Sequence, residues 1–399
     1  MTARPSPPGV YGIDLGIALD QRRVLVADHS AFNRRTLARF LNWAGIRDIE
    51  FAATGSETLA KVESFNPDLL LLDVVLPEID GIEVLKRIRQ DRLHADIPVL
   101  VQTTLVSDAL RTLCYQAGAT DILAKPVNPG ECIARVRYHL ERLALIQELR
   151  QFRERIEKEL KTARDMQLSL APERASLDAL AQRHNVSIDV FFESSEEIGG
   201  DFWSVFEIDS EHIGIVAADF SGHGITAAIN TFRLHTLIGR LAPGELRDPG
   251  ATLTICARRL YELLPLGQFA TAFYGVLHSP SGELTYATAG APSPLLFRQG
   301  TPEMIDASGL FLGVTDDEVY PNEKLVLEPG NHLFLYSDAL VETRDDDGQM
   351  LGEDGLGEMA TRAIDVAPLH PLGALLTSFS ARFQGKVDDD QTAIWIRRN

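Results

Sequence analysis

Carboxylates beside glycines and at the ends of apolar runs are the residues of this sequence best suited to chemistry. Asp201 follows a pair of glycines, and Asp219 precedes the turn Phe220-Ser221-Gly222-His223-Gly224. Two further aspartates, Asp338 and Asp389, each close an apolar stretch. Ligand sets made only of oxygen suit Mg²⁺ or Mn²⁺. We therefore expect these four carboxylates to converge, although they are far apart in the sequence.

A second set of chemically suited residues lies in the first third of the chain. Asp28, Asp73, Thr103 and Lys125 each follow a short apolar run, and these runs alternate with segments of helical periodicity. This alternation is typical of a doubly wound α/β domain, in which helices wrap a parallel sheet. Because the carboxyl ends of such strands share one edge of the sheet, we expect the four side chains to meet there.

Residues 23–140 resemble the receiver domain of two-component response regulators. The resemblance rests on Asp73, Thr103 and the pair Lys125-Pro126, whose spacings fit without gaps. It implies a five-stranded parallel sheet, with Asp73 as phosphoacceptor for a cognate sensor histidine kinase. It also implies that Thr103 and Lys125 form the switch and that Asp28 and Asp73 hold Mg²⁺. A cation is needed because a carboxylate that attacks a phosphate dianion meets strong repulsion.

The sequence departs from the receiver pattern after the first strand. Where receivers usually carry two adjacent acidic residues, a gapless alignment gives Asp28 and then His29. A neutral imidazole is a poor ligand for hard Mg²⁺, so His29 either weakens phosphorylation, shifts it toward Mn²⁺, or belongs to a domain that switches without phosphate. Alternatively, a one-residue shift gives Ala27-Asp28 the place of the acidic pair and turns His29 toward solvent. We expect slow, metal-dependent phosphorylation of Asp73.

Residues 131–170 are predicted to form one long helix, and residues 141–172 a helical or coiled-coil linker between two domains. The apolar residues of this helix follow an a/d alternation that only Glu159 interrupts. The seam consists of Leu145, Leu149, Phe152, Ile156, Ala163, Met166 and Leu170. A parallel coiled coil that joins two subunits into a homodimer is expected, and the alternative is a helix packed on its own chain.

Short predicted strands dominate the chain beyond Pro172 and alternate with helical segments. The strands are expected over residues 186–192, 202–208, 212–219, 270–277, 284–289, 325–327 and 333–336. The helices are expected over residues 177–183, 227–241, 251–264, 353–367 and 372–383. This mixture predicts an α+β domain over residues 173–399, in which an antiparallel β-sandwich is flanked by helices.

The same region resembles the SpoIIE/RsbU branch of the PPM-type, metal-dependent serine/threonine phosphatases. The motifs that carry the resemblance occur in order: Ala163-Arg164-Asp165-Met166-Gln167, Gly199-Gly200-Asp201-Phe202, Asp219-Phe220-Ser221-Gly222-His223-Gly224, Tyr336-Ser337-Asp338 with Glu342, and Asp389-Asp390-Gln391-Thr392. The resemblance implies that Asp201, Asp219, Asp338 and Asp389 are the catalytic residues and hold two Mn²⁺ or Mg²⁺ ions, with the Phe220 carbonyl as a further ligand.

Two such ions lower the pKa of a bridging water and neutralise a phosphomonoester while hydroxide attacks in line. The substrate that the resemblance implies is a phosphorylated STAS-domain anti-sigma-factor antagonist, whose dephosphorylation lets it capture its anti-sigma partner. His223 could serve as an acid or a ligand, or could equally cap or pack. Asp388 and Asp390 are expected either to orient neighbouring groups or to face solvent.

Several positions depart from the phosphatase pattern. Ser204 stands where the family often has another aspartate, Ala291 and Pro292 replace polar residues, and Ala339 replaces a common glycine. None of these changes removes an expected metal ligand. Phosphatase activity is therefore expected. We expect this chain to differ from the family in how it positions its substrate.

The composition limits the partners and the compartment. A formal net charge of -19 argues against general affinity for nucleic acid or anionic membranes. The sequence shows neither a signal peptide nor a membrane-spanning run, and three single cysteines without metal-ligand spacing suit a reducing, cytoplasmic location. Residues 1–22 are expected to form a flexible tail.

Two other functions compete with that of a phosphatase. Gly199-Gly200-Asp201-Phe202 is similar to the GGDEF motif of diguanylate cyclases, but the glutamate is missing and too few residues precede the motif for that fold. A non-catalytic protein that sequesters a partner in response to phosphorylation is the other alternative. It is disfavoured because four clustered carboxylates repel one another without a cation.

Overall fold

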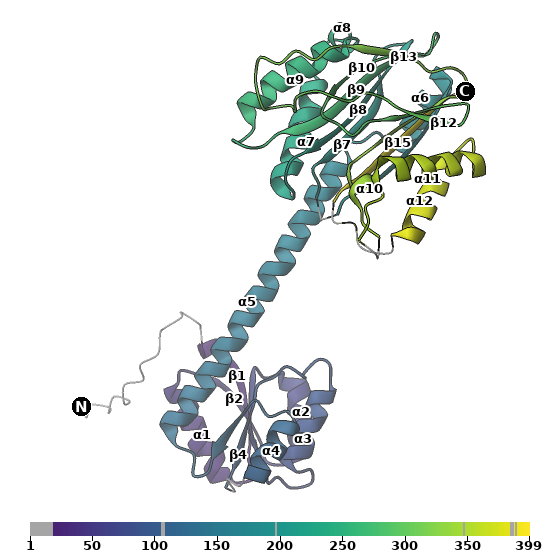
Figure 1. The fold of residues 1–399 in the computed structure, drawn as a ribbon. Coiled ribbons are helices and arrows are strands. Elements are labelled where there is room, and N and C mark those ends of the chain that lie inside the picture. Colours follow the sequence, from purple (N-terminus) through teal and green to yellow (C-terminus); the bar gives the residue numbers. More distant parts are fainter. Residues whose placement is uncertain (1–18, 105–107, 196–197, 346–347, 384–386, 388) are drawn as a thin grey trace. The chain divides into compact units, whose positions relative to one another are not determined.

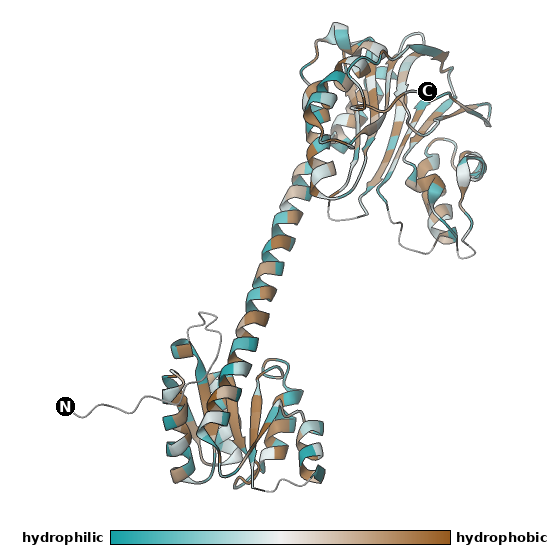
Figure 2. Cartoon of the chain, turned by 60° about the vertical axis from the view of Figure 1, so that its left-hand side comes forward, coloured by the Kyte–Doolittle hydropathy of each residue, from teal (hydrophilic) through white to brown (hydrophobic). Residues whose placement is uncertain are grey.

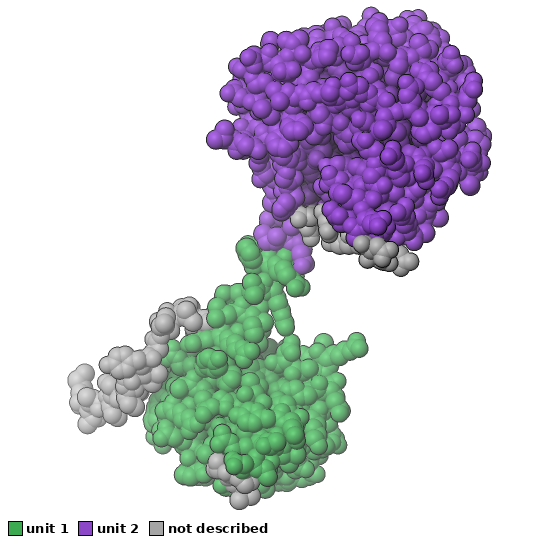
Figure 3. Space-filling view, viewed as in Figure 1, with its two compact units in different colours: residues 1–155 green, residues 156–399 purple. Residues whose placement is uncertain are grey.

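A computed structural model describes residues 19–104, 108–195, 198–345, 348–383, 387 and 389–399. The chain divides into two compact units, Met1–Arg155 and Ile156–Asn399 (Figure 3). Most of the predicted tail over residues 1–22 lies outside the described residues, as does Asp388. The first described element is the short 3-10 helix η1, Leu19–Gln21.

The first unit contains one sheet of five parallel strands in the order β2-β1-β3-β4-β5, as the sequence predicts (Figure 1). The strands are β1 Arg23–Ala27, β2 Asp48–Ala52, β3 Leu69–Asp73, β4 Val99–Thr103 and β5 Asp121–Ala124. The helices between them are α1 Ala31–Trp43, α2 Gly55–Phe65, α3 Gly81–Gln90 and α4 Asp108–Gln116.

The apolar run of β3 is continuous because both faces of this strand are buried. Leu70 and Leu72 pack into one hydrophobic cluster, and Leu69 and Leu71 pack into another. Helices cover both faces of such a sheet, so successive side chains of a strand both enter a core. The strands therefore carry their polar residues at the carboxyl ends.

Helix α5 covers Pro129–Leu168, close to the predicted 131–170. Within the first unit it contributes Cys132, Val136 and Leu140 to a hydrophobic cluster with β1 and β3. Farther along, Leu149 and Phe152 of the predicted seam are 68% and 59% exposed. The last predicted seam position is wrong, because Leu170 lies beyond the helix and packs against a core of the second unit.

The second unit contains two five-stranded antiparallel sheets, with the strand orders β13-β10-β9-β8-β7 and β12-β11-β14-β15-β6. The first sheet consists of β7 Asp201–Glu207, β8 His212–Phe220, β9 Ala270–His278, β10 Glu283–Ala289 and β13 Glu323–Val326. The second consists of β6 Val186–Glu193, β11 Leu295–Arg298, β12 Thr301–Met304, β14 His332–Tyr336 and β15 Gln391–Arg398. The helices are α6 Arg174–His184, α7 Ile225–Ile238, α8 Pro243–Leu246, α9 Pro249–Leu263, α10 Ala339–Glu342, α11 Gly352–Val366 and α12 Pro371–Arg382.

Three hydrophobic clusters hold the second unit together as a β-sandwich flanked by helices. One joins the facing sheets through residues such as Ile215 and Ile394. Another joins β8 and β9 to α7 and α9, and the third joins β14 and β15 to α11 and α12. Figure 2 shows the apolar residues concentrated along the strands and on the inner faces of these helices. The predicted α+β sandwich is confirmed.

Strands β11, β12 and β15 and the short helices α8 and α10 are absent from the sequence prediction. The expectation that Asp389 closes an apolar stretch is also wrong, since Asp389 precedes β15. Arg397 and Arg398 at the end of β15 obscure its strand pattern. Buried residues from Ala393 to Ile396 nevertheless make it a central strand.

The three cysteines, Cys114, Cys132 and Cys256, are buried and form no disulfide. Burial raises the pKa of the Cys132 and Cys256 thiols to about 12. None of the helices in the described part of the chain combines the length and the apolar composition that crossing a bilayer requires.

Candidate metal and phosphoryl-transfer sites

Antiparallel pairing places Asp201 and Asp219 side by side. Asp201 begins β7, Asp219 lies near the end of β8, and the two are direct partners in the strand register. Such partners on one face of a sheet have side chains close enough to interact. Together with burial, the charge of Asp219 raises the pKa of Asp201, which reflects this proximity. The pairing of β7 with β8 therefore brings together two aspartates that lie 18 positions apart in the sequence.

The second sheet brings Asp338 and Asp389 to its own edge in the same way. Asp338 follows β14 and Asp389 precedes the antiparallel strand β15, so both lie at the same end of this strand pair. The Ser337 N–H donates to the Thr392 carbonyl at 2.9 Å. The Thr392 hydroxyl donates to Asp201 Oδ2 at 2.5 Å, which ties this edge to that of the first sheet.

The electrostatics of these aspartates are those of a crowded anionic cluster. Burial, followed by the charge of Asp219, raises the pKa of Asp201 well above its usual range. Burial and the charges of Asp338, Asp389 and Asp390 raise the pKa of Asp219 to about 8. Burial, the charge of Asp389 and that of Glu342 raise the pKa of Asp338. Each shift reports that a charged carboxylate is disfavoured here until positive charge arrives.

A cavity of about 270 Å³ opens beside this cluster. Asp201, Asp219 and Asp338 line it, together with Glu342 and Thr392. Ala291 and Pro292, the apolar departures from the phosphatase pattern, line it as well. Asp389 is exposed and lines a second cavity of about 250 Å³ with His223, Gly222 and Asp390.

Of the two alternatives for Asp390, orientation or solvent, the structure supports orientation, because the side chain is buried and bonded to the turn before Asp201. Its buried carboxylate accepts the N–H groups of Gly200 at 2.7 Å, Asp201 at 3.3 Å and Ser195 at 2.9 Å. It also accepts the Ser194 hydroxyl at 2.9 Å. Asp390 therefore fixes the backbone that carries Asp201. The only signal in the sequence is its place beside Asp389.

The glycine pair before Asp201 is needed for space. A Cβ atom on Gly199 would lie 1.9 Å from Asp390 Oδ2, and one on Gly200 would lie 2.7 Å from the Phe220 carbonyl oxygen. The Phe220 carbonyl thus faces the turn that leads to Asp201. The ligand role of this carbonyl stays a prediction.

Gln167, near the end of α5, binds the same turn from the other side. Its Nε2 donates to the Gly199 carbonyl at 2.8 Å and to the Thr231 hydroxyl at 3.3 Å, and its Oε1 accepts the Gly199 N–H at 3.2 Å. The side chain is buried. Gly199 is therefore held by the long helix on one side and crowded by Asp390 on the other.

In the receiver, the carboxyl edge of the sheet assembles the predicted residues. Lys125 Nζ lies 2.7 Å from Asp28 Oδ2 and 2.8 Å from Asp73 Oδ2. Asp28, Asp73 and Thr103 are buried, and the Lys125 N–H donates to the Thr103 carbonyl at 2.8 Å. Asn33, which sequence reasoning did not single out, donates to both oxygens of Asp28 at 3.2 and 3.1 Å.

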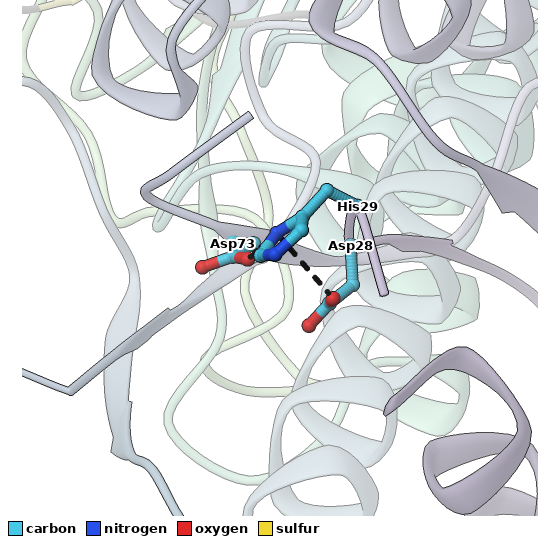
Figure 4. Close-up of side chains that lie close together, drawn as sticks. All are labelled: Asp28, His29 and Asp73. Carbon is cyan, nitrogen blue, oxygen red and sulfur yellow. Dashed lines mark hydrogen bonds and ion pairs between the residues drawn. The ribbon is translucent and has the colours of Figure 1, made fainter. Parts of the chain in front are cut away.

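His29 lies in this receiver site, as the gapless alignment expects (Figure 4). Its Nδ1 is 3.1 Å from Asp73 Oδ2 and 3.9 Å from Asp28 Oδ1. The shifted alternative is wrong, because Ala27 is a buried residue of β1 and the imidazole contacts Asp73.

The two sites fit metal ions differently. Among the described residues, Asp28, His29 and Asp73 are the group of three whose donor atoms all lie within 4.8 Å of one another. The phosphatase carboxylates are spread more widely around their cavity. Two ions lie roughly 3.5–4 Å apart in two-metal sites, so ligands shared between them need not meet at one point. The raised pKa values support the fit of cations at that site.

Comparisons with known proteins identify a domain in each of the two regions. Residues 24–137 match the response regulator receiver domain, and residues 209–399 match Stage II sporulation protein E (SpoIIE). The chain is 28% identical over 189 residues to the phosphoserine phosphatase RsbP of Bacillus subtilis, which covers 46% of each chain. It is 38% identical over 121 residues to the alkaline phosphatase synthesis transcriptional regulatory protein PhoP of Bacillus subtilis, covering 30% of this chain and 49% of PhoP.

The chain thus spans about half the length of the curated relatives it matches. The solved SiaA-PP2C domain of Pseudomonas aeruginosa shares the fold, with a TM-score of 0.54 and 22% identity over 62% of this chain and 98% of that one. The match to SpoIIE over residues 209–399 argues against the alternative that this region is a diguanylate cyclase. The chain therefore contains a response regulator receiver domain over residues 24–137 and a SpoIIE-type PPM phosphatase domain over residues 209–399.

Proposed function

We propose that this protein is a response regulator whose output is the metal-dependent hydrolysis of phosphoserine or phosphothreonine in a partner protein. The observation that carries the proposal is that three carboxyls line one cavity, Asp201 and Asp219 from paired strands and Asp338 from the edge of the other sheet. Burial and neighbouring carboxylates raise the pKa of all three. Divalent cations are the ions that relieve such a cluster of oxygen ligands.

The ligands of two Mn²⁺ or Mg²⁺ ions would be Asp201, Asp219, Asp338 and Asp389, with the Phe220 carbonyl. When bound, these ions lower the pKa of a water and neutralise the phosphoryl group. The Thr392 hydroxyl fixes one oxygen of Asp201. Ala291 and Pro292 give the cavity an apolar wall, which we expect to affect how the substrate is positioned.

Hydrolysis of p-nitrophenyl phosphate with Mn²⁺ tests the proposal. Turnover is expected from the wild-type chain, lost on chelation, and lost in Asp219→Ala. The matched control is Asp178→Ala, which removes an exposed carboxylate on α6 and should leave turnover unchanged. Undiminished turnover in Asp219→Ala would contradict the proposal. A stable complex with a phosphoprotein and no turnover would instead support the non-catalytic alternative.

In the receiver, we propose that Asp73 accepts a phosphoryl group from a sensor histidine kinase. Lys125 supports this role, because its ammonium group contacts Asp73 Oδ2 and can neutralise the incoming phosphate. Thr103, at the end of β4, would respond to the phosphoryl oxygens. Intact-mass measurement after incubation with acetyl phosphate tests the site, and no adduct with either Mg²⁺ or Mn²⁺ would contradict it.

We propose that α5 couples the two activities. Gln167 supports this, because the helix that begins in the receiver ends with a buried side chain bonded to Gly199, two residues before Asp201. A change in the helix that disturbs these bonds would move the backbone of the metal-binding turn. Phosphorylation of Asp73 would change how residues 131–140 of α5 pack on the receiver. That change in packing would determine whether turnover by the phosphatase rises or falls.

A phosphorylated STAS-domain anti-sigma-factor antagonist is our proposed substrate. The relative RsbP, named a phosphoserine phosphatase, supports the class of substrate. The free thiols support a cytosolic place of action, where such a partner would be met. An Asp219→Ala chain should trap its phosphoprotein in a pull-down, and mass spectrometry of the captured protein would identify it.

We also propose a homodimer formed along α5. Leu145, Leu149, Phe152 and Met166 are each at least half exposed, and they repeat at the a/d spacing of a coiled coil. Exposed apolar stripes of this length usually mark an interface.

A further inference from the structure

Three oxygen atoms lie near the Nδ1 atom of His29, two from the segment at the end of β3 and one from the preceding residue, Asp28. Asp73 Oδ2, at the end of β3, lies 3.1 Å away. The Val75 carbonyl oxygen, two residues later, lies 3.2 Å away. Asp28 Oδ1, after β1, lies 3.9 Å away. One donor atom from each of Asp28, His29 and Asp73 lies within 4.8 Å of the others, which is close enough for the three side chains to share one ion. Figure 4 shows the imidazole turned toward both carboxylates.

The backbone that carries His29 is fixed. Arg34 Nη1 donates to the carbonyl oxygens of Asp28 at 2.6 Å and His29 at 3.1 Å. The Ser30 N–H donates to Asp28 Oδ1 at 2.8 Å, and Ser30 also caps α1. These bonds hold the backbone of Asp28 and His29 in place before any ion arrives, as the contacts that orient metal ligands do. The side chain of His29 is 51% exposed, which leaves the ion a route from solvent.

The donor set favours one class of ion. Two carboxylates and an imidazole carry one negative charge fewer than the three acidic side chains usual in receivers, which weakens attraction for Mg²⁺. Imidazole nitrogen forms stronger bonds with first-row transition ions than with Mg²⁺.

We propose that His29 Nδ1 is a ligand in the receiver and that this site selects a divalent first-row transition ion over Mg²⁺. The proposal deepens the proposed role of Asp73 and rests on it for its consequence, which is phosphorylation supported by such an ion. Ion binding itself is independent of whether Asp73 is phosphorylated.

Titration of the full chain with Co²⁺ tests this assignment. A histidine bound to Co²⁺ gives a hyperfine-shifted, solvent-exchangeable imidazole N–H signal in the proton NMR spectrum. The signal is expected in the wild-type chain and absent in His29→Gln, which has no imidazole. The control is His223→Asn, which removes the histidine beside Asp389 in the phosphatase and should keep the signal. Circular dichroism confirms that the variants fold.

Competition between ions gives a second measurement. Mg²⁺ in about tenfold excess should leave the Co²⁺ signal of the wild-type chain intact. In His29→Asp, which restores an acidic pair, affinity for Mg²⁺ at the receiver should rise at least about tenfold. A signal that persists in His29→Gln, or Mg²⁺ affinity that is the same or higher in the wild-type chain than in His29→Asp, would overturn the proposal. Absence of an acetyl-phosphate adduct while the Co²⁺ signal is present would overturn the role of Asp73 and leave the ligand assignment standing.

Discussion

The carboxylate of Asp390 holds the backbone of Gly200, since its Oδ2 accepts the Gly200 N–H at 2.7 Å. Gly200 precedes β7 of one sheet, Asp390 precedes β15 of the other, and 190 positions separate them in the chain. One further bond from the same oxygen reaches the N–H of Asp201. The loop before β15 and the turn before β7 therefore move as one piece. The position of Asp201 depends on a side chain that need not touch a metal.

Replacing Asp390 tests that dependence. In Asp390→Ala the N–H groups of Gly200 and Ser195 lose a buried acceptor, which should lower the free energy of unfolding by roughly 1–3 kcal/mol. Turnover should fall at least about tenfold because Asp201 loses its fixed place. Urea unfolding and p-nitrophenyl phosphate hydrolysis measure the two effects. Ser194→Ala, which removes one donor only, is the control, and equal turnover in both variants would contradict this role.

The second prediction concerns Gly199, where the structure leaves no room for a side chain. A Cβ atom at this position would lie 1.9 Å from Asp390 Oδ2, and that carboxylate is held by several donors and cannot easily retreat. Gly199→Ala should therefore abolish most turnover. Gly373→Ala in α12 is the matched control, because nothing lies within 4 Å of its added Cβ. This control should keep full turnover, and Gly199→Ala with wild-type turnover would refute the crowding argument.

The buried His332 predicts a loss of stability in acid. Burial, followed by the charge of Arg397, lowers its pKa to about 4. Trp395 Nε1 donates to His332 Nδ1 at 3.0 Å, so protonation would break this bond. Below an unfolded pKa of about 6.5 the unfolded chain binds the extra proton and the folded chain does not. The stability that the neutral ring provides is complete above that pKa and falls as the pH drops toward 4, by up to roughly 3 kcal/mol.

His332→Asn should flatten this dependence, because the amide oxygen can accept from Trp395 without titrating. Urea unfolding followed by tryptophan fluorescence at about pH 7.5 and about pH 4.5 gives the comparison. The exposed His370→Asn variant should retain the wild-type slope. If His332→Asn and the wild-type chain lose equal stability in acid, another group is responsible.

Gln167 should transmit the state of the receiver to the phosphatase. Gln167→Ala removes both bonds to Gly199, so turnover should become independent of receiver phosphorylation. The measurement compares turnover before and after acetyl phosphate, with modification of Asp73 confirmed by mass. Arg164→Ala, which changes an exposed residue of α5 that is not part of the seam, is the control. A Gln167→Ala chain that still responds to phosphorylation would show that coupling runs elsewhere.

The exposed seam of α5 should hold two chains together. Leu149→Glu with Phe152→Glu places charges on the stripe without touching either core. Light scattering coupled to gel filtration should then give the mass of a monomer where the wild-type chain gives that of a dimer. The same two charges at Arg153 and Lys158, off the seam, should leave the dimer intact. A monomeric wild-type chain would end this proposal.

The sequence predicts which residues meet in the receiver site because the apolar runs mark the strands and the parallel order of the strands then fixes where their ends lie. Short apolar runs give the strands, and parallel strands place Asp28, Asp73 and Thr103 at one edge. The pairing of Asp201 with Asp219 is similarly accessible, since a short turn connects β7 and β8.

The rest depends on contacts between distant parts of the chain, which periodicity does not encode. The role of Asp390 is set by a turn 190 residues earlier. Strand β15 is concealed by its terminal arginines, and its central place comes from pairing with β6 and β14. The contact of His29 with Val75 likewise needs the loop after β3 to fold back toward β1.

The burial of Cys114, Cys132 and Cys256 has a practical value for studying this chain. Thiolate is the reactive form of cysteine, and the pKa of each of these thiols is raised by burial. Maleimide reagents should therefore react little with the native thiols. A single cysteine introduced on the exposed surface of α5 would become the preferred attachment point for a spin label or a fluorophore. Motions of this helix can thus be followed by distance spectroscopy without first rebuilding the protein as a cysteine-free variant.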